Sequence, residues 1–182
     1  KILWDGSRII IDTSYRSALI STDGISWTET PYTWSQGSAG SFNDVVWDGN
    51  NFFAVGSYIT NRAAIHKSSN GIEWVNLSGS FNIPGNLYSI TYGGGKLVAT
   101  GVSDNTQANS TIITSADQGA SWEVQTMNTR RFHKVVWDNN EFIIMGRVSL
   151  NPYPMKTYFS QDGLTWNDQS TGLSQGTPIL ND

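Results

Sequence analysis

Four short stretches of the chain each combine a serine hydroxyl, a carboxylate or amide, a glycine and a tryptophan. They read STDGISW (21–27), SSNGIEW (68–74), SADQGASW (115–122) and SQDGLTW (160–166). Side chains of this kind can act as general acids or as metal ligands. A catalytic centre brings different residues to one point, whereas here the same residue types return once in each stretch. The pattern therefore favours a repeated structural turn over a catalytic or metal site.

Such a turn accounts for each residue type in the motif. An Asp or Asn side chain can accept hydrogen bonds from nearby backbone N–H groups, which makes an Asx turn. The glycine supplies a backbone conformation that other residues adopt poorly. The tryptophan is expected to pack under the hairpin and to bury about 150–250 Å². The predicted acceptors are Asp23, Asn70, Asp117 and Asp162, and the predicted glycines are Gly24, Gly71, Gly119 and Gly163.

A second motif repeats alongside the first. The stretches 2–13, 45–56, 90–101 and 135–146 align without gaps on the aromatic residues Trp4, Trp47, Tyr92 and Trp137, which are 43, 45 and 45 residues apart. The tryptophans that close the first motif are 47, 48 and 44 residues apart. Two independent markers thus agree on a repeat of about 45 residues.

Each repeat reads as four short strands. In the second repeat we expect strands over 42–48, 52–55, 63–68 and 73–76, separated by turns rich in Asp, Asn and Gly. Four antiparallel strands that recur at this period are typical of a propeller blade. The sequence therefore predicts an all-β fold: a β-propeller of four four-stranded antiparallel blades. It forms one domain over residues 1–182, with repeats at about 1–41, 42–86, 87–131 and 132–182.

The first motif resembles the Asp-box, or BNR repeat, of sialidase-like β-propellers. Residues 115–122 match the full pattern Ser-x-Asp-x-Gly-x-Ser/Thr-Trp, and the other three copies are one residue shorter. The resemblance implies that the boxes lie at the periphery, away from any active site. A sialidase would also need an Arg triad, a Tyr–Glu pair and an Asp acid. That set cannot be assembled here, because the Arg-Ile-Pro signature is missing and Glu29, Glu73, Glu123 and Glu141 flank box or hairpin positions.

Blade topology assigns the loops to two faces. The Asp-boxes share one face with the uniformly short turns between first and second strands. The opposite face receives loops of variable length, and variable loops on a rigid scaffold are where binding usually resides. The candidate binding residues in these loops are Tyr32, Trp34, Tyr58, Arg62, Arg130, Arg131 and Tyr153. Trp34 is the one tryptophan outside the repeat positions.

A second set of candidates comes from comparing the repeats. Five residues before the anchor aromatic the chain is always apolar, but the next position holds Asn43, Tyr88 and His133 in successive repeats. These residues would enter near the central axis on the variable face. They are either ligand-binding residues or side chains that fill the channel.

Composition excludes several classes of function. The net charge is −4 with 14% charged residues, so there is no basic stripe for nucleic acid. No apolar run approaches the roughly 20 residues that span a bilayer. The chain has no cysteine and its two histidines lack a metal-ligand spacing, so we predict no cofactor and no metal site. His66 occupies a third-strand position and is interpreted as a strand residue. An extracellular, cell-surface or virion location is favoured over the cytoplasm.

Three arrangements of the ring remain open from sequence. Residues 179–182 (ILND) resemble 41–44 (SFND), and Lys1 aligns with Asp44. The tail could close a four-bladed ring, two chains could combine as a homodimer into a larger ring, or the chain could be an excerpt of a larger propeller. For function, we predict a non-enzymatic module that binds a glycan or a protein surface. The alternatives are a fragment of a sialidase-like glycoside hydrolase and a structural or assembly component.

Overall fold

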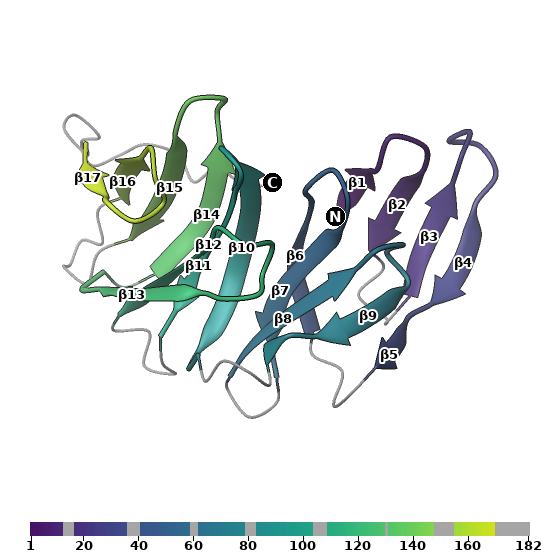
Figure 1. Cartoon of the computed structure of the whole chain (residues 1–182), viewed down its shortest axis with the longest axis horizontal. Helices are drawn as coiled ribbons and strands as arrows, with labels where there is room; N and C mark the ends of the chain where they lie inside the picture. Colours follow the sequence, from purple (N-terminus) through teal and green to yellow (C-terminus); the bar gives the residue numbers. More distant parts are fainter. Residues whose placement is uncertain are drawn as a thin grey trace.

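The computed structural model describes residues 1–12, 17–35, 41–58, 62–78, 83–103, 109–129, 131–147 and 155–169. These residues form four sheets, which we call blades 1 to 4, and each has four antiparallel strands that follow one another in chain order (Figure 1). The all-β propeller blades predicted from the repeat period are confirmed.

The strands of the four blades are as follows. Blade 1 contains β1 (Ile2–Trp4), β2 (Ile9–Asp12), β3 (Ser17–Ser21) and β4 (Thr28–Pro31). Blade 2 contains β6 (Ser41–Trp47), β7 (Phe52–Ser57), β8 (Ala63–Ser68) and β9 (Glu73–Asn76). Blade 3 contains β10 (Asn86–Gly93), β11 (Lys96–Val102), β12 (Ser110–Ser115) and β13 (Glu123–Met127). Blade 4 contains β14 (Arg131–Trp137), β15 (Phe142–Arg147), β16 (Met155–Ser160) and β17 (Asn167–Asp168).

Blade 2 has one strand that the repeat does not predict. Strand β5 (Thr33–Ser35) adds to the outer edge of this blade and pairs in parallel with β9, with Trp34 opposite Trp74. A parallel neighbour at a sheet edge leaves no trace in a repeat alignment, because it arises from the path of one connecting segment.

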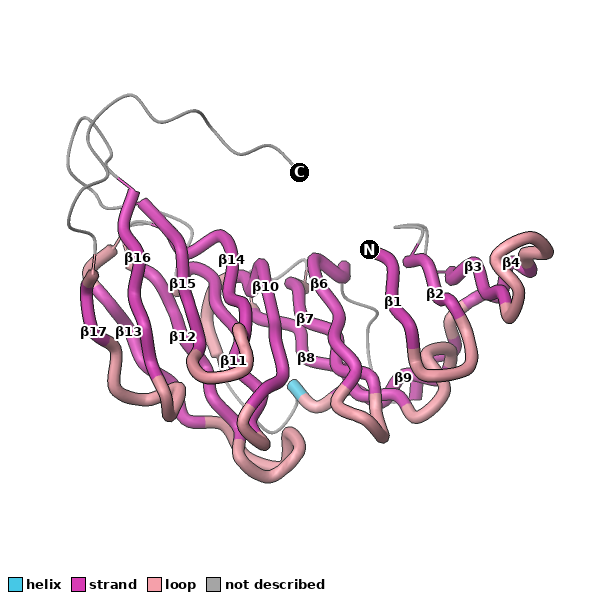
Figure 2. The backbone as a smooth tube through the Cα atoms, turned by 90° about the horizontal axis from the view of Figure 1, so that it is seen from above, coloured by secondary structure: helices cyan, strands magenta, loops and turns pink. Residues whose placement is uncertain are grey.

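The blades follow one another along an arc, and β4 and β17 lie at its two ends (Figures 1 and 2). The inner strand of each blade packs on the next one, β1 on β6, β6 on β10 and β10 on β14. Among the described strands, extended packing joins consecutive blades and does not join blade 4 to blade 1. Residues 179–182, which we expected to meet the first strand, lie outside the described part of the chain.

In the described part of the chain, the buried apolar residues form three clusters, one in each gap between consecutive blades. The cluster between blades 1 and 2 combines Ile10 with Phe52 and Trp74, and the cluster between blades 2 and 3 combines Phe53 with Leu97 and Trp122. Between blades 3 and 4, Val98 meets Phe142 and Val135. Strand residues therefore alternate between two buried faces, which explains why the second strands read as continuous apolar runs.

Candidate binding site at the inner strands

Three of the sequence-predicted residues occupy the same irregularity in three blades. The strand pairing skips one residue between Phe42 and Asp44, between Leu87 and Ser89, and between Phe132 and Lys134. The skipped residues are Asn43, Tyr88 and His133. A bulge leaves one residue outside the ladder and re-aims its side chain. Asn43, Tyr88 and His133, which differ between repeats, are therefore released from the strand pairing.

A glycine on the neighbouring strand accompanies each bulge. A Cβ atom at Gly56 would lie 1.7 Å from the carbonyl oxygen of Ser41. The corresponding distances are 1.9 Å from Gly101 to Asn86 O and 2.4 Å from Gly146 to Arg131 O. No side chain fits there, so the repeated glycine allows the bulged strand to approach. This glycine closes the second sequence motif in three repeats, and it was the available signal for the bulges.

The bulge residues contact the next blade. The Asn43 Nδ2 donates to Asn86 Oδ1 at 2.8 Å and to the carbonyl oxygen of Leu87 at 2.7 Å. The Arg131 guanidinium lies over the Tyr88 ring, 4.1 Å from its centroid, in a cation–π contact. These contacts form a row that runs from blade 2 through blade 3 to blade 4. Part of the row therefore holds adjacent blades together.

His133 ends the row and is exposed. Partial burial lowers the pKa of His133, and the positive charges of Arg131 and Arg147 lower it further. The imidazole is thus neutral near pH 7 and can both donate and accept a hydrogen bond. The Nε atom of Arg131 is buried and has no hydrogen-bond partner among the described residues. This end of the row combines two guanidinium groups with a neutral imidazole.

An ionic network lies one residue further along the inner strands. The repeat position of Asp44 holds Lys1, Ser89 and Lys134 in the other blades. The buried Asp44 carboxylate forms an ion pair with Lys1, and its Oδ2 lies 3.7 Å from the Lys134 Nζ. Oδ2 also accepts hydrogen bonds from the Ser89 hydroxyl at 2.9 Å and from the Ile90 N–H at 3.1 Å.

Asp44 thus contacts groups from all three other blades. With both carboxylate oxygens occupied, it is a structural anchor and not a free base. The sequence analysis did not predict this network, although it aligned Lys1 with Asp44 and so placed two charged residues at the same repeat position.

The remaining candidates lie elsewhere or outside the described residues. Tyr32 is buried between Phe42 and Trp74, and its hydroxyl donates to Asp12 Oδ1 at 2.9 Å. Burial, together with Asp12, raises the pKa of Tyr32. This tyrosine therefore belongs to the interior of the molecule and not to a binding surface.

Tyr58 is half-buried, and its hydroxyl lies 3.3 Å from His66 Nε2. His66 itself lies in β8 and is fully buried, as expected of a strand residue. Arg62 is exposed beside Pro84. Trp34 lies in β5, and its side chain is outside the described part of the chain, as are Arg130 and Tyr153.

The four predicted Asx turns are confirmed. The Oδ1 of Asp23 accepts hydrogen bonds from the N–H groups of Ile25 and Ser26 at 2.8 and 2.7 Å. Asn70 and Asp162 make equivalent bonds, whereas Asp117, in the copy that is one residue longer, accepts from the N–H of Ser121 at 2.9 Å. The four glycines have φ between 73° and 82°. Hydrogen bonds from the turn lower the pKa of Asp23, Asp117 and Asp162 to about 2. These carboxylates are ionised and already engaged, so they are poor general acids.

One part of the turn prediction is wrong. Trp74 and Trp122 are buried, but Trp27 of blade 1 is 38% exposed. No blade among the described residues precedes blade 1, so this tryptophan has nothing to pack against on its outer side.

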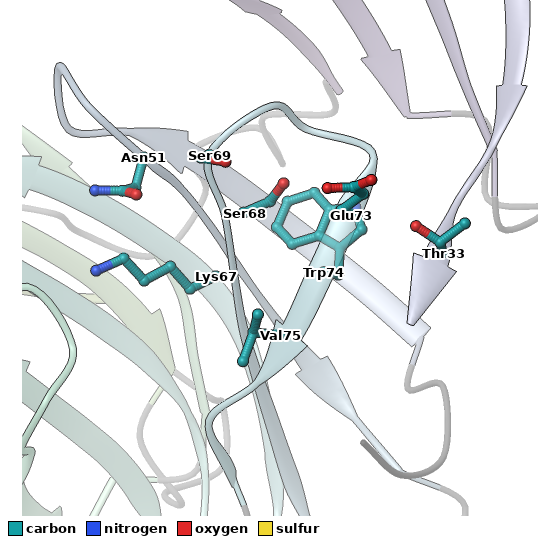
Figure 3. A pocket seen from close by; sticks show the side chains of 8 residues that line it. All are labelled: Thr33, Asn51, Lys67, Ser68, Ser69, Glu73, Trp74 and Val75. Atoms are coloured by element: carbon teal, nitrogen blue, oxygen red, sulfur yellow. The ribbon is translucent and has the colours of Figure 1, made fainter. Parts of the chain in front are cut away.

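A pocket that sequence reasoning did not find lies beside the Asx turn of blade 2 (Figure 3). It has a volume of about 450 Å³ and is lined by Thr33, Asn51, Lys67, Ser68, Ser69, Glu73, Trp74 and Val75. The lining contains one carboxylate, that of Glu73, whereas most glycosidases place two across the scissile bond. The pocket therefore does not supply a hydrolytic pair.

The described residues support neither a metal site nor a membrane-spanning helix. No group of three His, Cys, Asp or Glu side chains in this part of the chain is placed to hold a metal ion. Nor does the described part contain a helix of the length and apolarity needed to cross a membrane.

Comparison with known proteins identifies the fold. No protein-family model matches the sequence, and no curated protein matches it. The solved structures similar to this chain include the sialidase of Trypanosoma rangeli, with 18% identity and a TM-score of 0.63 over 93% of this chain and 37% of that one. A structure of YCF48 bound to D1 peptide has 16% identity and a TM-score of 0.55 over 96% of this chain and 54% of that one. A GH43 β-1,3-galactosidase has 11% identity and a TM-score of 0.53 over 92% and 44%. The chain thus spans about a third to a half of the length of these proteins, and what it shares with them is the β-propeller fold.

Proposed function

We propose that this chain is a non-enzymatic binding module that recognises a protein surface through the row formed by Asn43, Tyr88, Arg131 and His133. We further propose that its four turns are Asp-boxes of the BNR type. The single observation that carries the binding proposal is the coincidence of divergence and bulges. Three residues that differ between repeats are released by the strand pairing at the same level of three adjacent inner strands.

The chemistry of the row favours a polypeptide ligand that carries carboxylates. Arg131 contributes a guanidinium group that stacks on the Tyr88 ring, and Asn43, whose Nδ2 is engaged with Asn86 and Leu87, contributes its amide oxygen. Tyr and Arg are common anchors at protein interfaces. Arg147 lies opposite Arg131 in the pairing of β14 with β15, which adds a second guanidinium group to this end of the row. Guanidinium groups bind carboxylates with charge-assisted hydrogen bonds. Among the structurally similar proteins, YCF48 is bound to a peptide, which is consistent with peptide binding on this fold.

A glycan remains the second candidate ligand, since aromatic rings next to amide groups also suit sugars. The pocket beside Trp74 offers Asn51, Lys67 and Glu73 for hydrogen bonds to hydroxyl groups (Figure 3). It lies at the outer strands β5, β8 and β9, whereas the row lies on the inner strands. Substitutions in the row should therefore affect the binding of a polypeptide, and substitutions in the pocket beside Trp74 should affect the binding of a glycan.

The binding test uses an array of short acidic and amidated peptides together with a glycan array. We expect acidic peptides to bind, and Arg131→Gln to weaken binding by at least about tenfold. The matched control is Lys156→Gln, which removes a cation from the outer part of blade 4, where Lys156 pairs with Asp168. Equal losses in both variants, or glycan binding that only Trp74 pocket variants abolish, would contradict the proposed site.

The enzymatic alternative has its own test. Fluorogenic sialosides and galactosides should show no turnover above buffer. Turnover by the wild-type chain would replace the binding module by a glycoside hydrolase.

A further inference from the structure

The sequence contains a single Asn–Gly peptide bond, between Asn70 and Gly71 in the Asx turn of blade 2. The other three Asx turns carry Asp at the position of Asn70. An asparagine before glycine deamidates readily, because glycine has no side chain to keep its backbone nitrogen away from the asparagine amide. Blade 2 therefore places a chemically labile bond at the centre of a structural turn.

Deamidation of Asn70 uses the backbone nitrogen of Gly71 as the nucleophile. This nitrogen loses its proton and attacks Asn70 Cγ, the bond from Cγ to Nδ2 breaks, and ammonia leaves with that proton. The product is a five-membered succinimide. Water then opens the ring at either carbonyl and returns a proton to the nitrogen, which leaves aspartate or isoaspartate at position 70.

The folded turn engages both reacting groups. The Gly71 N–H donates to Ser68 Oγ at 2.8 Å. Asn70 Oδ1 accepts from the N–H groups of Ile72 and Glu73, each at 2.9 Å. Gly71 is also buried. A base from the solvent reaches a buried, hydrogen-bonded N–H only when the structure opens locally, as in amide hydrogen exchange. The closed turn therefore protects the nitrogen that would start the reaction.

A hairpin turn of the same blade has similar geometry without this protection. Asp48 Oδ1 accepts from the N–H groups of Asn50 and Asn51 at 2.8 and 2.7 Å, the acceptor pattern of an Asx turn. Gly49 follows Asp48 and has positive φ, like the glycines of the Asx turns. Gly49 is exposed, however, and its N–H has no hydrogen-bond partner among the described residues. The two turns thus differ in the cover over the glycine nitrogen.

A serine covers the glycine nitrogen in all four Asx turns. Its Oγ accepts a hydrogen bond from the glycine N–H at 2.8 or 2.9 Å, and each of the four serines is buried. The pairs are Ser21 with Gly24, Ser68 with Gly71, Ser115 with Gly119 and Ser160 with Gly163. In blade 2 this serine covers a nitrogen that follows an amide side chain.

Glu73 gives a reason for the amide in blade 2. The other three turns have Ser26, Ser121 or Thr165 at the position of Glu73. The hydroxyl groups of Ser121 and Thr165 donate to the carboxylate of their turn. Glu73 has no hydroxyl group to donate, and a second carboxylate at position 70 would repel it. An amide avoids this repulsion but makes the bond labile.

We propose that Asn70–Gly71 is a deamidation site that reacts only when the turn of blade 2 opens, and that the Ser68 hydroxyl keeps it closed. The extent of deamidation then measures how often this turn has opened. The aspartate product keeps an acceptor oxygen, as in the other three turns. The isoaspartate product lengthens the main chain by one methylene group, so it displaces Gly71 from Ile10 of blade 1, against which it lies.

The test compares deamidation rates in mildly alkaline buffer by peptide mass spectrometry, with enzymatic methylation of isoaspartate as a second readout. Wild-type Asn70 should react at least about tenfold more slowly in the folded chain than in urea. Ser68→Ala should raise the folded-chain rate by at least about fivefold, because a hydrogen bond that holds the turn closed is lost. Ser160→Ala is the matched control: it removes an equally buried serine and a 2.8 Å bond from blade 4, and should leave the rate at Asn70 unchanged.

Asp48→Asn provides a comparison within one folded chain, because it creates a second Asn–Gly bond in the uncovered hairpin turn. Position 48 should react at least about tenfold faster than position 70. Equal rates at the two positions overturn the proposal, as does a folded wild-type chain that reacts as fast as in urea. So does Ser68→Ala if it reacts no faster than Ser160→Ala. Circular dichroism shows whether each variant is folded, and if Ser68→Ala is not, the two rates in Asp48→Asn decide.

Discussion

Blades 1 and 2 build the same turn but bury its tryptophan to different degrees. In blade 1, Asp23 accepts two backbone hydrogen bonds at 2.8 and 2.7 Å, and in blade 2, Asn70 accepts two at 2.9 Å each. The following glycines have φ of 73° and 74°. Yet Trp27 is 38% exposed and Trp74 is 3% exposed. The geometry of the turn is thus local to the motif, while the burial of its tryptophan depends on the blade before it.

This difference separates two contributions to stability. The hydrogen bonds of the turn lie within the seven-residue motif and form in either blade. The burial of the tryptophan, in contrast, requires a preceding blade to pack against. Substitutions at equivalent positions of the two blades therefore measure one contribution at a time.

The largest expected difference is between the two tryptophans. Trp74→Ala should lower the free energy of unfolding by about 3–5 kcal/mol, because it opens a cavity in the core between blades 1 and 2. Trp27→Ala should cost about 1–2 kcal/mol, since much of its surface is already in water. Urea denaturation of both variants tests this difference. Equal losses would mean that blade 1 is covered in the folded chain.

Acid should destabilise blade 2 through His66. Blade 1 has Leu19 at the equivalent position and should not show this effect. Burial lowers the pKa of His66 to about 4, below its ordinary value of 6.5. Between these two values the unfolded chain binds the proton and the folded chain does not, so the stabilisation is complete above pH 6.5 and is lost as the pH falls toward 4. The full effect approaches about 3 kcal/mol.

The pH dependence is measured by urea denaturation from pH 7 to pH 4. The Tyr58 hydroxyl lies 3.3 Å from the imidazole, so Tyr58→Phe tests whether this contact matters. In the variant His66→Leu, which introduces the residue that blade 1 has at this position, the free energy of unfolding should no longer fall between pH 6.5 and pH 4 because of this group. If the pH dependence of the free energy of unfolding persists in His66→Leu, it arises from other titratable groups.

Local features of blade 2 could be predicted from the sequence, and non-local ones could not. The bounds of β8 and β9 agree with the predicted strands, because turn residues at both ends fix them. The skipped residue Asn43 and the added strand β5 depend on pairing with distant parts of the chain. The same holds for the contacts of Asp44, which come from three other blades. A motif that is the same in every blade does not predict which residues of other blades each copy contacts.

The turn glycines should show a smaller difference than the tryptophans. Both have positive φ, so alanine at either position is strained by about 1–2 kcal/mol. A Cβ at Gly71 would also lie 3.0 Å from the Cδ1 of the buried Ile10, whereas at Gly24 the nearest contact is Ile9 Cδ1 at an ordinary 3.6 Å. Gly71→Ala should therefore cost more than Gly24→Ala. In the double variant Gly71→Ala with Ile10→Val, this excess should shrink.

The smallest expected difference is between the side chains that make the turns. Asn70→Ala removes two hydrogen bonds to backbone N–H groups and should cost about 1 kcal/mol. Asp23→Ala removes the same two bonds and should cost a similar amount near pH 7, because the preceding blade does not enter this interaction. The two positions differ only in acid. The pKa of Asp23 is lowered to about 2, so its contribution is complete above pH 3.8 and is lost as the pH falls through 2. Asn70 has no such dependence, and Asp23→Asn should remove it from blade 1 while keeping both hydrogen bonds. If Asp23→Ala and Asn70→Ala differ at pH 7 by as much as the tryptophan variants do, then the turn is not local, and the separation of turn geometry from blade packing is wrong.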